Sequence, residues 1–247
     1  MPTLELNKGK THLSVLDEWL DKHWQYARHL HAESVLVYSA DAQRLQYWLD
    51  MWCQQRRYKP VRWQMTEADR SLPWSPLLPV LQQLAAGQDE VVTRFCLKQQ
   101  LMGPEQTLLT AALRGKIPVR KEYPLPDDLN FQTRRFQQLL LQLLSEFTQT
   151  QPLLILLSGV EHAGITGWSM LEALMQMPDE GRFLLVMGCD PAFRQADDAL
   201  QMAWEQWLGM EDAHAHFRLE DEMASTSPLS ELDTWPEMAP SLLGSQD

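Results

Sequence analysis

Cysteine is scarce in this sequence. Cys53, Cys96 and Cys189 are the three cysteines among 247 residues, and they lie far apart in the chain. Secreted domains that depend on disulfides carry a dense, even set of cysteines, and cysteine-rich metal sites need closely spaced ligands. The scarcity of cysteine therefore excludes a disulfide framework and a cysteine-rich metal site. It also favours a reducing compartment, the cytoplasm.

Basic residues and long apolar runs are also in short supply. Lys and Arg number 21 against 33 Asp and Glu, so the formal net charge is −12. Binding to nucleic-acid phosphates or to an anionic membrane needs a basic surface, which argues against both partners. No apolar run approaches the roughly 18 residues that a transmembrane helix needs. The N-terminal segment also lacks the apolar stretch of a signal peptide. We therefore expect no membrane insertion and no direct contact with nucleic acid.

What the sequence does contain is a globular composition with clear periodicity. Hydrophobic residues make up 45% and charged residues 22%, and the length is enough for one large α/β domain or two small ones. Short apolar or alternating runs predict five strands, at residues 34–39, 60–65, 152–159, 183–189 and 215–220.

The segments between these runs carry apolar residues at three- and four-residue spacing, which predicts helices. The helices are expected at 12–31, 41–57, 89–102, 104–115, 131–149, 165–177 and 191–208, with one more that begins near Pro76 or Pro79 and ends at Gly87. Apolar strands that alternate with helices are typical of a parallel sheet covered on both faces. We therefore expect an α/β fold with a parallel sheet of about five strands flanked by helices on both faces.

The domain organisation follows from the same periodicity. Residues 1–220 are expected to form one domain, with an N-terminal helix at 12–31 and a helical insertion at about 75–149. From Glu220 to Asp247 there are seven acidic residues and no Lys or Arg. Together with Ser, Thr and Pro, this composition predicts that residues 221–247 form an acidic, mostly disordered tail.

Ligands of an open parallel sheet bind beyond the carboxyl ends of its strands. A phosphate loop after the first strand would need glycines, a lysine and a Ser or Thr. Residues 39–48, SADAQRLQYW, contain neither glycine nor lysine. Asp41 would repel a triphosphate, and Arg44, the only cation of this segment, lies inside the predicted helix. Ser39 or Asp41 is better interpreted as the N-cap of that helix.

The carboxyl end of the third strand would hold carboxylates that bind magnesium and polarise water. Ser158 and Gly159 occupy this position, and neither side chain can neutralise a metal ion. Glu161 and His162 follow, and such a pair can act as base and ligand. Without a phosphate site the pair has no substrate to act on, so we expect Glu161 to lie in a solvated loop.

Three segments resemble the ATPase domain of STAND-type AAA proteins, the P-loop signalling ATPases of large transcription regulators and of cyclase- and kinase-linked sensors. Residues 66–87, TEADRSLPWSPLLPVLQQLAAG, are similar to the segment after that family's second strand. Residues 134–176 are similar to its Walker B region, and 183–191 to its next strand. The likeness spans roughly residues 30–220, and it implies a RecA/AAA-like sheet.

The departures from the family pattern carry the functional expectation. Ser158 and Gly159 stand where the family has paired acids, Glu161 and His162 at its His-Trp, and Gly164 at the Asp that follows. The phosphate loop has no match, so no ATP-contacting residue and no cofactor can be carried over. The resemblance then implies a pseudo-ATPase, a catalytically inactive ATPase-like module. It would act as a protein-binding regulatory or adaptor protein in bacterial-type signalling or gene regulation. A homo-oligomer is compatible with this expectation.

The alternative is a non-canonical nucleotide-binding protein or NTPase that uses atypical residues. Its ligand would be held by Arg44 or by a basic segment. That segment comprises Arg114, Lys116, Arg120 and Lys121, with Arg134 and Arg135 nearby. The same residues can equally form a solvated loop or pair with the acidic tail.

Two further candidates are weaker. The pairs His29/His31 and His214/His216 have the spacing of metal ligands, but no third ligand is evident. Cys189 stands at a strand's carboxyl end, where a nucleophile would need a nearby base. For the histidines we expect no metal site, and for Cys189 a buried structural thiol.

Overall fold

The sheet of this protein is parallel throughout. The computed structural model describes residues 12–29, 31–39, 41–71, 74–116, 129–177, 181–190 and 215–218. Its strands are β1 (Glu33–Tyr38), β2 (Val61–Gln64), β3 (Leu153–Ser158), β4 (Phe183–Cys189) and β5 (Ala215–Arg218). They lie in the order β2-β3-β4-β1-β5, and every pairing is parallel. The expected α/β fold with a parallel sheet is confirmed.

The number of strands needs a correction. Four strands, β2-β3-β4-β1, make up the body of the sheet, whereas we expected about five. The fifth predicted strand is present only as β5, a four-residue segment that pairs with β1 at the edge. Its side chains lie outside the described residues, so the core can be assigned only to the other four strands.

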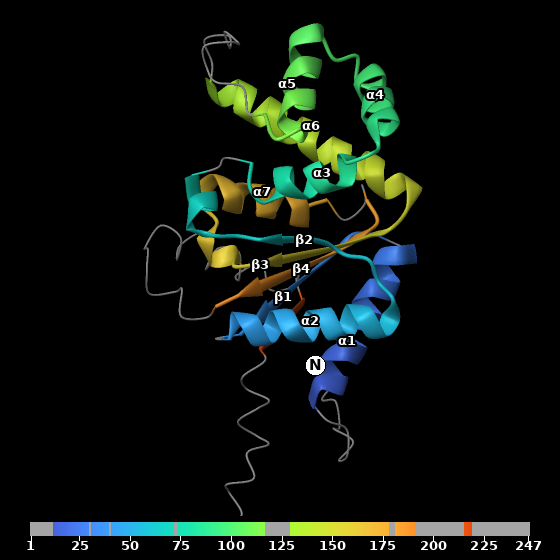
Figure 1. The fold of residues 1–247 in the computed structure, drawn as a ribbon, viewed down its shortest axis with the longest axis vertical. Coiled ribbons are helices and arrows are strands. Elements are labelled where there is room, and N and C mark those ends of the chain that lie inside the picture. Colours follow the sequence, from blue (N-terminus) through green and yellow to red (C-terminus); the bar gives the residue numbers. More distant parts are fainter. Residues whose placement is uncertain are drawn as a thin grey trace, which may run out of the picture.

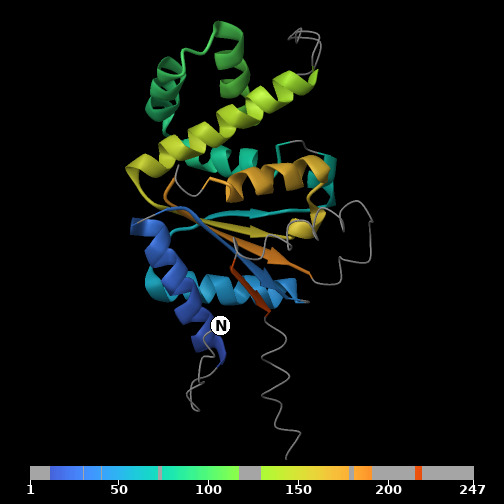
Figure 2. The ribbon, with the colours of Figure 1, turned by 180° about the vertical axis from the view of Figure 1, so that it is seen from behind.

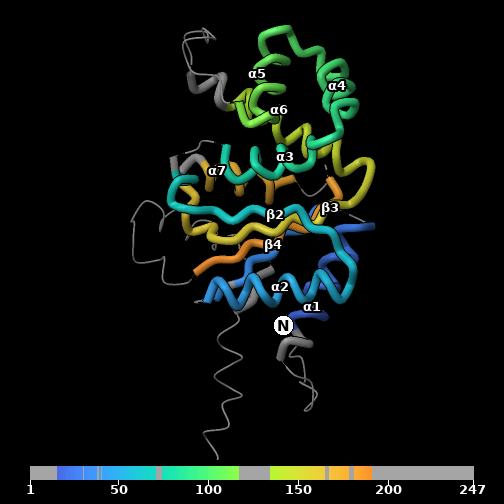
Figure 3. Tube along the Cα trace, in the orientation of Figure 1, coloured from blue at the N-terminus to red at the C-terminus, as the bar shows by residue number. Residues whose placement is uncertain are grey.

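Helices cover both faces of the sheet (Figures 1 and 2). They are α1 (His12–His29), α2 (Ala42–Arg56), α3 (Leu77–Ala85), α4 (Asp89–Lys98), α5 (Gly103–Leu113), α6 (Leu129–Thr150) and α7 (Ile165–Met175), with short 3-10 helices η1 (Glu67–Ser71) and η2 (Val160–His162). Helices α1 and α2 lie on one face, and α3, α6 and α7 on the other. Helices α4 and α5 form an outer layer beyond α3, which the chain trace shows most clearly (Figure 3).

The alternation of side chains along β3 explains why both faces need helices. Leu154 and Leu156 pack with α1 and α2. Ile155 and Leu157 pack on the opposite face with α3, α6 and α7. Because successive side chains of a strand point to opposite faces, a run that is apolar at every position must be covered on both sides. The continuous apolar run in the sequence predicted this arrangement correctly.

The helices themselves match their predicted apolar stripes. The six apolar residues of the α6 stripe are all buried: Phe136, Leu139, Leu140, Leu143, Leu144 and Phe147. On α1, Leu16, Leu20, Trp24 and Ala27 are buried as well. Trp24 therefore belongs to the core and does not supply an exposed aromatic surface.

The predicted helix at 89–102 is too long by a turn. Helix α4 ends at Lys98, and Gln100 adopts a left-handed conformation with φ 51°. The backbone N–H of Leu101 then donates to the Cys96 carbonyl at 3.0 Å, which closes the helix end. The next helix, α5, starts at Gly103 and has a proline in its first turn, a position that proline favours.

Two predicted segments, the helix at 191–208 and the acidic tail at 221–247, lie outside the described residues. Among the helices that the structure describes, none is both long and apolar enough to cross a membrane.

Candidate functional site at the carboxyl end of the sheet

The turn between β1 and α2 is short and internally bonded. Only residues 39–41 separate the strand from the helix. The backbone N–H of Ser39 donates to the Cys189 carbonyl at 3.0 Å, which extends the strand pairing by one step. The Asp41 carboxylate accepts a hydrogen bond from the Arg44 N–H at 2.9 Å. Asp41 is therefore the N-cap of α2, as predicted.

This cap occupies the N-terminus of α2, which an anion could otherwise approach. Free backbone N–H groups at the N-terminus of a helix attract anions, and here a carboxylate of the chain itself already accepts one of them. The first turn of α2 also packs tightly on the sheet. A Cβ atom at Gly188 would lie 2.7 Å from the Leu45 Cδ2 atom. The turn therefore presents a carboxylate and a packed helix end at the carboxyl end of β1.

The segment after β3 is shaped by a glycine that the geometry requires. Gly159 has φ +70°, and a Cβ there would lie 2.6 Å from the Met65 carbonyl oxygen. The Ser158 carbonyl accepts a hydrogen bond from the Met65 N–H at 2.8 Å. Ser158 and Gly159 therefore join the ends of β2 and β3, and they contribute no carboxylate.

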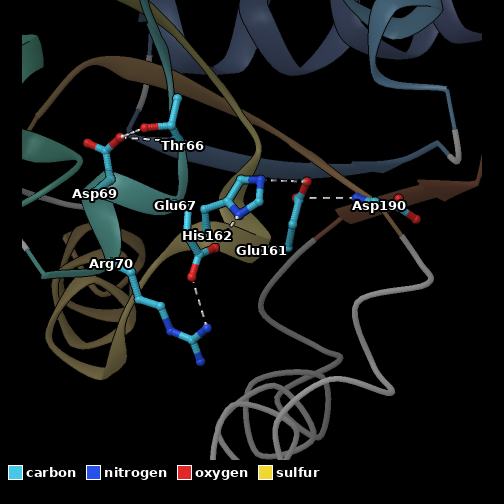
Figure 4. A network of polar contacts seen from close by, with 7 residues as sticks. All are labelled: Thr66, Glu67, Asp69, Arg70, Glu161, His162 and Asp190. Atoms are coloured by element: carbon cyan, nitrogen blue, oxygen red, sulfur yellow. Dashed lines mark hydrogen bonds and ion pairs between the residues drawn. The ribbon is translucent and has the colours of Figure 1, made fainter.

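A polar network follows immediately, and it corrects the prediction for Glu161. The Glu161 side chain is only 15% exposed, so it is not part of a solvated loop. Its Oε2 atom accepts a hydrogen bond from the Asp190 N–H at 3.3 Å, and its Oε1 atom lies 3.9 Å from His162 Nε2. His162 Nδ1 lies 3.3 Å from Glu67 Oε2, and Arg70 Nη1 donates to Glu67 Oε1 at 3.3 Å. Figure 4 shows these contacts between η1, η2 and the end of β4.

Asp69 is the residue of this region that the sequence analysis missed. It is 4% exposed, and its carboxylate accepts hydrogen bonds from the Thr66 N–H and hydroxyl, the Ser75 hydroxyl and the Trp63 indole, at 2.8 to 3.2 Å. Burial alone would raise the pKa of this carboxyl, but these donors outweigh burial and lower it. The signal was Thr66 three residues earlier, a spacing typical of a side chain that bonds nearby backbone.

Two more glycines bring η1 and α7 into contact. A Cβ at Gly164 would lie 2.2 Å from the Arg70 carbonyl oxygen, and a Cβ at Gly167 would lie 3.0 Å from the Ser75 carbonyl oxygen. Gly164 stands where the STAND resemblance has an Asp. Here any side chain would collide with the backbone of η1, so packing excludes an acidic residue at this position.

No group of three metal-ligating side chains occurs among the residues whose side chains are described. His31 Nε2 lies 2.9 Å from Glu33 Oε1, and His23 Nδ1 lies 2.9 Å from Glu33 Oε2. His31 therefore contacts a carboxylate on β1, at the opposite end of the sheet. The side chains of His214 and His216 lie outside the described residues.

Two residues of the predicted basic segment lie in ion pairs. Arg114 Nη2 lies 3.9 Å from Asp89 Oδ1, and Arg135 Nε lies 3.6 Å from Glu105 Oε1. Lys116 is exposed, whereas residues 120 and 121 lie outside the described ranges. Arg114 also lines a cavity of about 320 Å³ between α3, α4 and α5. None of the residues that line this cavity belongs to the loops after β1, β3 or β4.

The described cysteines are buried thiols. Cys53, Cys96 and Cys189 are each less than 5% exposed. Burial raises the pKa of Cys53 to about 12 and raises that of Cys96. The Cys189 thiol donates to the Asp190 carbonyl at 3.5 Å. These are structural thiols, as predicted for Cys189.

Comparison of the chain with protein-family models and with curated proteins found no match.

Proposed function

We propose that this protein is a catalytically inactive ATPase-like module that acts by binding a protein partner, as a regulatory or adaptor protein in signalling or gene regulation. One observation carries the loss of catalysis: the Asp41 carboxylate caps the helix whose N-terminus would bind the phosphates. A triphosphate at this position would meet like charge and would have to compete with the cap for the Arg44 N–H.

The strand order supports an ATPase-like origin of the fold. Strand β4 lies between β1 and β3 and is parallel to both, so the turn after β1 and the segment after β3 open at the same edge of the sheet. Ligand-binding loops of open α/β sheets gather at this edge. The sheet is compatible with a RecA-like architecture, which is the fold implied by the resemblance to STAND-type AAA proteins.

The segment after β3 supports the loss of metal chemistry. Transfer of a phosphoryl group depends on carboxylates and Mg²⁺ that neutralise the developing charge. Ser158 and Gly159 offer none, and the Glu161 carboxylate is engaged with the Asp190 N–H and the His162 ring. Each charge-assisted contact to a phosphate is worth about 1.5 to 3 kcal/mol, so losing several together removes most of the affinity.

Exposed apolar side chains support a protein partner. Leu97 is 74% exposed and Met102 is 72% exposed, both where α4 passes into α5, and Tyr47 on α2 is 67% exposed. Large apolar and aromatic side chains anchor protein interfaces. These three residues are the candidates for contact with the partner.

Calorimetry tests the loss of nucleotide binding. We expect no heat with ATP or ADP at millimolar concentration, with or without Mg²⁺, and no phosphate release. Asp41→Ala removes the carboxylate from the turn, and Gln43→Ala, at an exposed position of the same helix, is the matched control. Micromolar binding by the unaltered protein would overturn the proposal and favour the nucleotide-binding alternative.

Affinity capture from the native cell tests the partner. We expect one stoichiometric protein, and we expect Leu97→Ser with Met102→Gln or Tyr47→Ala to weaken its capture while the unfolding temperature stays unchanged. The buried conservative variant Leu81→Ile is the control for general loss of structure. Recovery of the chain alone, with a nucleotide bound, would contradict the proposal.

A further inference from the structure

A cavity of about 320 Å³ lies where α3, α4 and α5 meet, away from the carboxyl end of the sheet. Helix α3 contributes its last residue, Ala85, helix α4 its first, Asp89, and helix α5 its last, Leu113. Figure 3 shows how α4 and α5 stand beyond α3. We propose that this cavity binds an α-amino acid with an apolar side chain, an activity that goes beyond the function proposed above.

The floor of the cavity is apolar. Val92 and Leu113 line it, are each 8% exposed and belong to the larger hydrophobic core. Ala85 packs against the same core, and its short side chain leaves space that a longer one would fill. Removing apolar surface from water is favourable, so this floor suits the apolar side chain of a ligand.

Charges of both signs stand at the rim. Arg114 Nη2 lies 3.9 Å from Asp89 Oδ1, which is longer than a hydrogen bond. The two side chains are 64% and 88% exposed, so their direct attraction is weak. An α-amino acid carries a carboxylate and an ammonium group on the same carbon atom. Its carboxylate pairs with the Arg114 guanidinium and its ammonium with the Asp89 carboxylate, which exchanges one weak ion pair for two charge-assisted contacts.

Two half-buried polar side chains also line the cavity, Gln82 and Thr110. The Gln82 Nε2 atom donates to the Ala112 carbonyl at 2.8 Å, which joins α3 to α5 and fixes the orientation of the amide group. The Gln82 Oε1 atom can accept from an ammonium, and the Thr110 hydroxyl can donate to a carboxylate. A few placed polar groups above an apolar floor are typical of sites for small molecules.

The size and charge of the cavity restrict its ligand. Sites for small molecules ordinarily enclose about 300 to 1,000 Å³, so this cavity lies at the lower end of that range. A nucleotide carries several negative charges, whereas the lining residues offer the charge of Arg114 and the opposing charge of Asp89. A ligand with one charge of each sign matches this pair, and the apolar floor favours a side chain such as that of leucine.

A titration of the full chain with L-leucine, followed by NMR of the backbone amides, tests the proposal. At a typical binding free energy per ligand atom, a ligand of about nine non-hydrogen atoms binds with a Kd of about 1 mM. The amide signals of Gly87, Thr110 and Leu113 should shift with this saturation. The analogue 4-methylpentanoate lacks the ammonium group, and isopentylamine lacks the carboxylate. Each should bind about fivefold more weakly than leucine.

Variants separate the cavity from general charge effects. Arg114→Gln and Asp89→Asn should each weaken the binding of leucine about fivefold. Lys116→Gln and Glu90→Gln are the matched controls, because both residues are exposed and neither lines the cavity. They should leave the Kd unchanged within about twofold. Ala85→Leu fills the cavity and should abolish saturable binding, with circular dichroism and the unfolding temperature as checks that the variant is folded.

Several results would overturn the proposal. It fails if leucine causes no saturable shift at concentrations well above the expected Kd, or if the shifts lie at residues outside the cavity. Equal binding of leucine and both analogues would show that the paired charges are not recognised. An equal loss in Lys116→Gln and Arg114→Gln would show that any nearby cation serves. The titration uses neither a nucleotide nor a captured protein, so its outcome is separate from those that test the proposed function.

Discussion

Replacing Asp69 with Ala should destabilise this protein more than removing any other carboxylate of η1. The carboxylate accepts four hydrogen bonds, and the residue is 4% exposed. Without it, the Thr66 N–H, the Ser75 hydroxyl and the Trp63 indole N–H lose their acceptor in a site that admits little water. Leaving a buried donor unsatisfied costs about 1 to 3 kcal/mol. Some donors can rearrange, so we expect a loss of about 4 kcal/mol in the free energy of unfolding.

Asp69→Asn distinguishes charge from shape. The amide keeps the size of the carboxylate but offers a single acceptor oxygen, and its NH₂ group faces donors. We expect it to cost about 2 kcal/mol, between the unaltered protein and Asp69→Ala. Glu67→Ala is the matched control, because Glu67 lies on the same short helix and is 70% exposed. Its effect should stay within about 1 kcal/mol.

Urea unfolding followed by tryptophan fluorescence measures these differences, and pH adds an independent check. The donors lower the pKa of Asp69 in the folded state. The stability that its charge contributes is therefore present above the unfolded pKa and is lost as pH falls through the folded pKa. The difference in the free energy of unfolding between the unaltered protein and Asp69→Asn should have its full value at pH 7 and should become smaller below about pH 4. If the urea midpoint of Asp69→Ala equals that of Glu67→Ala, the hydrogen bonds to Asp69 do not stabilise this loop and the reasoning is refuted.

Three further outcomes are expected. Gly164→Ala should lower the free energy of unfolding by about 3 kcal/mol, because its Cβ would lie 2.2 Å from a backbone oxygen. Gly103→Ala is the control, because nothing lies within 4 Å of its Cβ, and it should not destabilise the protein. Thermal unfolding of both variants measures the difference. Burial alone would raise the pKa of Glu33, but the two histidines that contact it outweigh burial and lower this pKa. In urea titrations, Glu33→Gln should therefore reduce stability at pH 6 and have little effect below about pH 4. An equal loss of stability at both pH values would contradict this. The buried cysteines, with the pKa of Cys53 raised to about 12, should react with a thiol reagent only after denaturation, and rapid labelling of the native chain would show that they are accessible.

The regular parts of this protein follow from local patterns in the sequence. The apolar run of β3 and the stripe of α6 predicted their elements because burial needs a period of two in a strand and near 3.6 in a helix. Asp41 as an N-cap also followed from the sequence, since capping involves only residues three positions apart. The absence of glycine and lysine in residues 39–48, and of acids at Ser158 and Gly159, was equally visible without a structure.

Tertiary structure alone decided the rest, because the partners are distant in the chain. Asp69 gathers donors from either side of η1, including Ser75 at 2.8 Å, and Glu161 binds the N–H of Asp190, 29 residues away. Spacing along the sequence places Glu161 in a loop, but only the meeting of β2, β3 and β4 at one edge makes that loop half-buried. Gly164 likewise looked like a lost acid in the sequence. Only the fold shows that the backbone of η1 fills the space where any side chain would lie.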